Sequence, residues 1–155
     1  MKYYAAYGSN MNLQQMASRC PKAKVVVTGT IRNYQLVFNY HASIVKKSGC
    51  NTPIAIWALT KECEQALDRY EGFPTYYRKE NVHVITADGK RLIAMAYVMN
   101  KDVINIPSWQ YFRCILEGYK ALNIGPTPLY NAYERTLKNC KKDFTKPALN
   151  SFTSL

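Results

Sequence analysis

Acidic residues are scarce in this chain of 155 residues, and none of the ten precedes Glu62. Histidine is scarcer still, since His41 and His83 are the only two. Acid–base chemistry must therefore use these few carboxylates, the two histidines, or lysine and tyrosine side chains. The chain also lacks a Walker loop, a GxSxG elbow, an HExxH motif and a GxGxxG fingerprint. These absences remove the common signatures of nucleotide binding, serine hydrolases and zinc proteases.

Long apolar runs are absent as well. No stretch approaches the roughly 18 residues of a membrane-spanning helix, and residues 1–10 lack the apolar core of a signal peptide. The five cysteines are odd in number and show neither CxxC nor metal-ligand spacing. We interpret them as reduced structural thiols of a cytoplasmic protein. With two histidines in the whole chain, we expect no metal site.

Enough apolar material is present for one globular domain, because 48% of the residues are hydrophobic and 20% are charged. No linker or internal repeat divides the chain. We therefore predict a single domain over residues 1–140, followed by a tail over residues 141–155. The tail is basic and then rich in serine and threonine, and we expect it to be poorly ordered.

Positive charge dominates, with 21 lysines and arginines and a formal net charge of +11. Such a surface suits nucleic acid or another anionic partner, or simply solubility. However, the 13 tyrosines are spread over predicted strands and helices, and no RNA-binding motif is present. Nucleic-acid binding therefore stays as an alternative, and we expect neither a nucleic acid nor a membrane as partner.

Apolar periodicity predicts a chain in which strands dominate and helices are inserted, which is the α+β class with a mixed sheet. We expect a turn around Arg32 and Asn33, a polar loop at residues 46–51, and a hairpin turn at residues 87–90. The predicted strands lie at residues 2–7, 25–31, 35–40, 54–59, 77–86 and 91–98. The predicted helices lie between Asn12 and Pro21 and at residues 61–71, 108–122 and 129–139, and the first two are capped by Asn12 and Thr60.

A first motif lies where the opening strand ends, in the sequence Tyr7-Gly8-Ser9-Asn10-Met11. We expect Gly8 to adopt a positive φ, so that the backbone turns sharply. Consecutive N–H groups at such a turn converge into an anion-binding concavity beside the following helix. The simpler interpretation is an ordinary connection between a strand and a helix.

A second motif ends the helix that Thr60 caps. Cys63, Ala66, Leu67 and Tyr70 form an apolar stripe, and Glu71 lies on its edge just before the helix-terminating Gly72. The negative end of the helix dipole and partial burial both raise the pKa of such a carboxyl. A raised pKa suits a general base near neutral pH. The simpler interpretation is a solvated glutamate beside a capping glycine.

These motifs, together with the Pro107-Ser108-Trp109-Gln110-Tyr111 segment, resemble those of the γ-glutamylcyclotransferase superfamily. The resemblance extends from residue 2 to about residue 125, and the YGSN form is closer to the γ-glutamylcyclotransferases proper than to the branch with YGT. It implies a small mixed β-barrel flanked by helices. It also implies that the protein needs no metal or cofactor.

The implied reaction is an intramolecular attack by the α-amine of a small γ-glutamyl amide on its own γ-carbonyl. 5-Oxoproline forms, and a free amine leaves. The resemblance makes Glu71 the catalytic base. The implied substrate-binding residues are Tyr7, Gly8, Ser9, Asn10, Met11 and Tyr111. We expect a monomer or a homodimer.

Two further alternatives remain. One is a hydrolase with Ser9 or a cysteine as nucleophile and His41 or His83 as base, although no local signature supplies the acid behind the histidine. The other is a relative that keeps the fold without catalysis. For Tyr111 alone, the simpler interpretation is a helix tyrosine that packs in the core. The leaving amine is not identified. The segment between Phe38 and Ala42 is shorter than in the animal enzymes of the family. The resemblance implies that this segment shapes the side of the pocket where the leaving amine binds.

Overall fold

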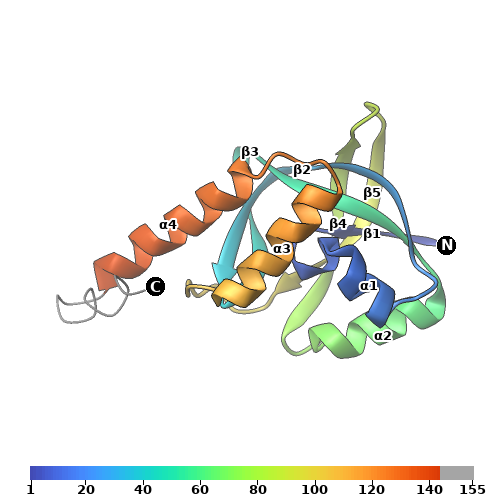
Figure 1. Ribbon diagram of the computed structural model, residues 1–155, viewed down its shortest axis with the longest axis horizontal. Coiled ribbons are helices and arrows are strands. Elements are labelled where there is room, and N and C mark those ends of the chain that lie inside the picture. Colours follow the sequence, from blue (N-terminus) through green and yellow to red (C-terminus); the bar gives the residue numbers. More distant parts are fainter. Residues whose placement is uncertain (144–155) are drawn as a thin grey trace.

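A computed structural model describes residues 1–143, which fold into a β-barrel with helices packed on its outside (Figure 1). The strands close in the order β1-β3-β2-β4-β5. All neighbours pair antiparallel except β1 and β5, which meet in parallel at Tyr4 and Met95. The α+β class and the mixed barrel are therefore confirmed. The strands are β1 (Lys2–Ala6), β2 (Lys24–Asn39), β3 (His41–Leu59), β4 (Tyr77–Thr86) and β5 (Arg91–Met99).

Strands β2 and β3 are longer than the sequence predicted. The expected turn at Arg32 and Asn33 is instead a bulge inside β2, where Asn33 has a φ of +60° and the register shifts. The expected polar loop at residues 46–51 is part of β3. Both predictions were wrong because long-range pairing between the two strands outweighs the local turn signals. A tight turn at Tyr40 joins the strands and places His41 at the end of the barrel.

The barrel closes through a narrow seam between β2 and β4. Only Gly29 to Ile31 pair there, with Val84 to Thr86. A Cβ atom on Gly29 would lie 2.4 Å from the carbonyl oxygen of Ile85. Glycine is therefore what lets the two strands approach closely enough to seal the barrel.

The helices are α1 (Leu13–Arg19), α2 (Lys61–Glu71), α3 (Trp109–Ala121) and α4 (Thr127–Asp143), and a short turn η1 (Ser9–Met11) precedes α1. The predicted caps are confirmed. Asn12 accepts from Gln15 N at 3.1 Å, and Thr60 accepts from Cys63 N at 3.2 Å. Gly72 ends α2 in the left-handed conformation, with a φ of +64°.

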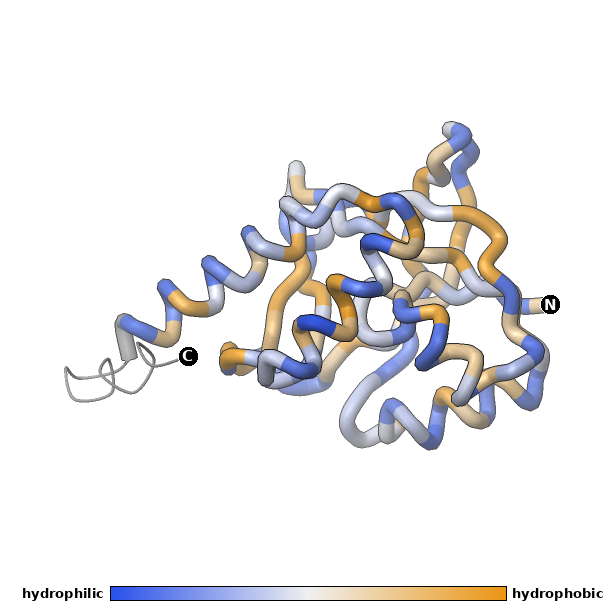
Figure 2. The backbone as a smooth tube through the Cα atoms, viewed as in Figure 1, coloured by the Kyte–Doolittle hydropathy of each residue, from blue (hydrophilic) through white to orange (hydrophobic). Residues whose placement is uncertain are grey.

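Helix α4 packs beside β2 and then projects from the barrel (Figure 1). Hydrophobic and hydrophilic residues alternate along α3 and α4 (Figure 2), and in α4 Leu129 and Ala132 are buried. The helix ends at Asp143, beyond the expected end at Asn139, and the rest of the predicted tail lies outside the described residues. No helix within residues 1–143 is long and apolar enough to cross a membrane.

Helix α3 lies directly on the turn that follows β1. A Cβ atom on Gly118 would lie 2.7 Å from backbone atoms of Met11, so a glycine is needed at this crossing. The side chain of Asn12 donates to the carbonyl oxygen of Cys114 at 3.0 Å. The YGSN segment is thus held between the barrel and α3.

Candidate active site

A pocket of about 190 Å³ opens at the end of the barrel where β1, η1, α2 and α3 meet. Its wall contains most of the residues that the sequence singled out, namely Tyr7, Gly8, Ser9, Asn10, Glu71 and Tyr111. The remaining lining residues are Tyr4, His41, Ala42, Tyr70, Tyr76, Tyr77 and Tyr97. The two motifs, whose residues Asn10 and Glu71 are 61 positions apart in the chain, therefore form one concave site.

Two expectations about the first motif need correction. Met11 is completely buried and does not line the pocket, because α3 covers η1 at Gly118. Gly8 has a φ of −111°, not a positive φ. A Cβ atom added at this position would lie 3.1 Å from Ala42 Cβ and 3.2 Å from the Tyr111 hydroxyl. Close approach, not backbone handedness, therefore favours glycine at this position.

Glu71 is the last residue of α2, and its carboxylate faces the pocket. Burial raises the pKa of Glu71 to about 7, while the positive charge of Arg19 and a hydrogen bond from Asn10 oppose this increase. Asn10 Nδ2 donates to Glu71 Oε1 at 3.0 Å. The direction of the pKa shift is the one that the position of Glu71 in the sequence predicts, and burial is its main cause.

Hydrogen bonds fix both the side chain and the backbone oxygen of Asn10. Its Nδ2 also donates to the Tyr4 hydroxyl at 3.0 Å, and its Oδ1 accepts from Arg19 at 2.5 Å. The indole of Trp57 donates to its backbone oxygen at 3.0 Å. The carboxamide is therefore fixed with its N–H groups toward Glu71.

Tyr70 does not complete the apolar stripe of α2 as predicted. Its side chain is 48% exposed, and the Arg19 guanidinium stacks on the ring at 3.6 Å. A guanidinium held over a tyrosine ring is a favourable cation–π arrangement. Tyr70 thus forms the outer wall of the pocket and not part of the core.

Tyrosine hydroxyls bind the backbone around the pocket. Tyr111 accepts a hydrogen bond from Ala42 N at 2.9 Å, and Tyr77 donates to Ala42 O at 2.7 Å. Tyr7 donates to the carbonyl oxygen of Tyr97. Burial raises the pKa of Tyr7 and of Tyr111 well above the ordinary value, so both hydroxyls remain protonated at neutral pH.

The two histidines differ in position. His41 lines the pocket, where burial lowers its pKa and Nδ1 lies 3.3 Å from the Tyr76 hydroxyl. His83 is exposed on β4 and does not line this pocket. Ser9 Oγ lies near Tyr70 and Arg19, at 3.5 and 3.4 Å, instead of near a histidine. This geometry does not favour the serine hydrolase alternative.

Sequence reasoning missed six lining residues that come from strands or from the loop after α2: Tyr4, His41, Ala42, Tyr76, Tyr77 and Tyr97. Alternation along residues 2–7 places Tyr4 on the opposite face from Tyr7, so it gave no signal that both line one pocket. Within residues 1–143, no three histidine, cysteine or acidic side chains cluster as a metal site would require.

Comparison with known proteins matches residues 4–113 to the family described as gamma-glutamyl cyclotransferase, AIG2-like. The chain therefore belongs to this family. The curated gamma-glutamylcyclotransferase of Homo sapiens is 28% identical over 130 residues, covering 76% of this chain and 69% of that protein. The mouse protein of the same name is 27% identical over the same shares.

Solved structures show the same fold. One described as a gamma-glutamyl cyclotransferase superimposes with a TM-score of 0.78 at 24% identity, covering 84% of this chain and 85% of that one. YkqA from Bacillus subtilis gives a TM-score of 0.71 at 19% identity, covering 87% of this chain and 54% of that one. These comparisons do not favour a nucleic-acid-binding module.

Proposed function

We propose that this protein is a γ-glutamyl cyclotransferase that converts a small γ-glutamyl amide into 5-oxoproline and a free amine. The observation that carries the proposal is the carboxyl of Glu71, which lies in a tyrosine-lined pocket with a pKa raised to about 7. Family membership supports the same reaction class. The YGSN segment supports the branch of γ-glutamylcyclotransferases proper.

Glu71 takes a proton from the α-amine of the substrate and later delivers it to the leaving nitrogen. An ordinary glutamate near ~4.3 and an amine near ~8 differ by about 3.7 pKa units, which is about 5 kcal/mol. With the pKa of Glu71 at about 7, roughly one unit of that difference remains. Burial of Glu71 thus makes the proton transfer nearly balanced.

The rest of the pocket supplies positioning. Ring closure is intramolecular, so holding the substrate in its reactive conformation is worth about 7–11 kcal/mol. The backbone N–H groups of Ser9 and Asn10 begin the η1 turn and suit the α-carboxylate or the developing oxyanion. Protonated tyrosine hydroxyls, such as those of Tyr7 and Tyr111, stay neutral beside the reacting groups.

The leaving amine faces the mouth of the pocket in this proposal. His41, the first residue of β3, and Tyr76, in the loop after α2, are exposed lining residues, and the His41 Nδ1 and Tyr76 hydroxyl lie 3.3 Å apart. A volume of about 190 Å³ is small for a ligand site, since drug-sized pockets are roughly 300–1,000 Å³. The γ-glutamyl group therefore fills the pocket, and a bulky leaving amine extends into solvent.

The test is a panel of γ-glutamyl amides, with amino acids, a peptide and a polyamine as leaving groups. 5-Oxoproline and the free amine are both measured. We expect equimolar release of the two products for at least one member. Glu71→Gln is expected to lower kcat by about 10²- to 10⁴-fold, the usual effect of removing a general base.

Glu62→Gln is the matched control, because Glu62 is exposed at the other end of the same helix. It is expected to retain wild-type kcat. Activity in the Glu71→Gln variant equal to that of the wild type would remove Glu71 from the mechanism. Absence of 5-oxoproline with every amide would reject the proposed function.

A further inference from the structure

Arg19, the last residue of α1, is the only arginine or lysine whose charge acts on the pKa of Glu71 among the described residues. It does not line the pocket. It forms no ion pair with any carboxylate in the described part of the chain, and its partners are neutral oxygens. Those oxygens belong to Asn10 at 2.5 Å, Gln15 at 2.6 Å, the Tyr70 hydroxyl at 2.6 Å and the Ser9 hydroxyl at 3.4 Å.

We propose that Arg19 is a positioning residue for Glu71. Its guanidinium fixes the orientation of the Asn10 carboxamide, and this orientation directs the Asn10 N–H group that donates a hydrogen bond to the Glu71 carboxylate. The inference rests on the proposed function. Asn10 Oδ1 accepts from Arg19, so the Nδ2 of the same amide must face Glu71 and Tyr4. Without the guanidinium, the amide can rotate and present its oxygen to the carboxylate.

Charge acts in the same direction as this geometry. A guanidinium near a carboxylate stabilises the ionised form, and so does an N–H donor. Burial alone would make Glu71 a weaker acid, and Arg19 limits that shift. Arg19 thus keeps Glu71 ionised enough near neutral pH to accept the substrate proton, without occupying the substrate's place.

Other groups around Glu71 cannot replace this effect. From β1, η1, β4, β5 and α3, the facing groups are tyrosines, which are neutral at neutral pH, and the uncharged Asn10. His41 is the remaining titratable side chain on the pocket wall, and burial lowers its pKa. Because His41 is titratable as well, the test must report on Glu71 itself.

The test is a titration of the Glu71 carboxyl by ¹³C NMR in the wild type and in Arg19→Met. We expect the pKa of Glu71 to rise by about one unit in the variant. Arg19→Lys keeps the charge and is expected to restore most of the wild-type value. A purely structural role of Arg19 would lower stability and leave the Glu71 pKa unchanged.

Kinetics give the second readout. An increase of one unit from about 7 lowers the ionised fraction at pH 7 about five-fold, so kcat/KM of Arg19→Met falls by about that factor and its acidic limb moves to higher pH. KM at high pH should stay near the wild-type value, because Arg19 is not on the pocket wall.

Arg69→Met is the matched control. Arg69 is exposed on α2 two residues from Glu71, and none of its side-chain atoms contacts the pocket. Its removal should leave the Glu71 pKa unchanged. If Arg19→Met does not fold, Arg19→Gln, which is also neutral, takes its place in the titration.

An unchanged Glu71 pKa in the neutral Arg19 variant overturns the inference. A shift of equal size in Arg69→Met overturns it as well, because any nearby charge would then suffice. The NMR titration needs no substrate. If the protein makes no 5-oxoproline, the proposed function is rejected. The NMR titration still shows whether Arg19 controls the pKa of Glu71.

Discussion

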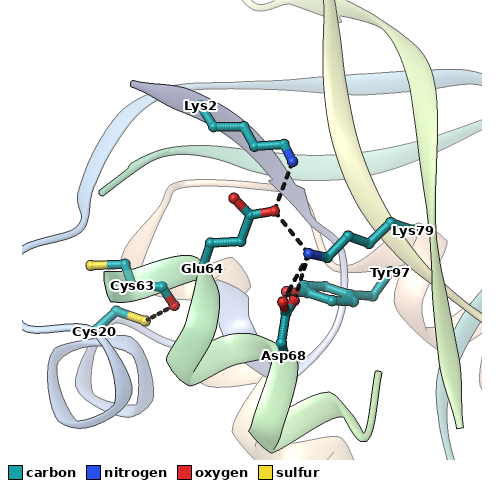
Figure 3. Close-up of polar contacts among 7 residues, drawn as sticks. All are labelled: Lys2, Cys20, Cys63, Glu64, Asp68, Lys79 and Tyr97. Carbon is teal, nitrogen blue, oxygen red and sulfur yellow. Dashed lines mark hydrogen bonds and ion pairs between the residues drawn. The ribbon is translucent and has the colours of Figure 1, made fainter. Parts of the chain in front are cut away.

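The two ends of helix α2 use carboxylates in opposite ways. Near its N-terminal end, Glu64 pairs with Lys2 at 2.7 Å and with Lys79 at 2.8 Å, and Lys79 also pairs with Asp68 at 2.8 Å (Figure 3). At its C-terminal end, Glu71 has no ion pair within the described residues and faces the pocket. One end fastens the helix to β1 and β4, and the other carries the proposed chemistry.

The pKa values follow this division. Burial acts to raise the pKa of Glu64, but hydrogen bonds and charge from Lys2 and Lys79 outweigh burial and lower the pKa. At Glu71 burial prevails, and the pKa rises to about 7. The surroundings of a carboxylate, not the helix that carries it, therefore decide whether it stabilises the fold or is available to a substrate.

The two ends are also connected. Tyr97 donates its hydroxyl to Asp68 at 2.5 Å, and its ring lines the pocket. The carbonyl oxygen of the same residue accepts the Tyr7 hydroxyl. The ion-pair network thus braces one wall of the pocket in which Glu71 lies.

The largest expected effect is on the pH dependence of kcat/KM. The acidic limb of kcat/KM should lie near pH 7, so activity at pH 5 should be about 100-fold below the plateau. Glu64→Gln should show the same acidic limb as the wild type. A limb near pH 4.5 in the wild type would mean that burial does not tune Glu71.

The next effect is on stability. The folded pKa of Glu71 exceeds its unfolded value, so the folded state binds more protons between about pH 4.5 and 7 and loses stability as pH rises through that range. At pH 8, Glu71→Gln should therefore have a free energy of unfolding about 3 kcal/mol higher than that of the wild type, as measured by denaturant-induced unfolding. At pH 4 the two should be nearly equal, and a variant less stable at pH 8 would contradict this.

Glu64→Gln should lower the free energy of unfolding at neutral pH, and this change should be smaller than the increase expected for Glu71→Gln. The pKa of Glu64 is lowered, so its contribution is present above the unfolded value of about 4.5 and disappears as pH falls through the folded pKa. We expect a loss of about 1 kcal/mol at pH 7, since the pair is partly exposed, and almost none at pH 2. Equal losses at both pH values would indicate packing instead of charge.

The smallest effect concerns salt. Raising the ionic strength from about 0.05 to 0.5 M should weaken the Lys2–Glu64–Lys79 network by a few tenths of a kcal/mol. At the other end, kcat/KM should change less than about two-fold, because Glu71 is held by the uncharged Asn10 and screening acts on longer-range charges. A steep fall in kcat/KM would indicate that the net charge of +11 steers the substrate.

Local rules predicted what depends on local structure. The caps at Asn12 and Thr60, the end of α2 at Gly72 and the place of Glu71 beside it follow from short-range chemistry. The hairpin of β4 and β5 is likewise short in range. These features could be read from the sequence because each depends on residues a few positions apart.

Long-range packing decided the rest. Tyr70 faces Arg19 and not the core because α1 lies across its helix, and Met11 is buried because α3 covers η1 at Gly118. The span of β2 and β3 depends on their pairing across 16 and 19 residues. A short window of the sequence does not contain both partners of contacts such as Arg32 with Asn51 or Arg19 with Tyr70.

The barrel closure also bears on the order of events during folding. The contact between β1 and β5 joins Tyr4 to Met95, and Tyr7 reaches Tyr97, which are 90 residues apart. Contacts across such long loops form slowly, because the entropy of closing the loop is lost before the contact is gained. Hairpins such as β4–β5 can form first. We therefore expect the pocket to be among the last parts of the chain to assemble, so that a folding intermediate would have native hairpins and no binding site.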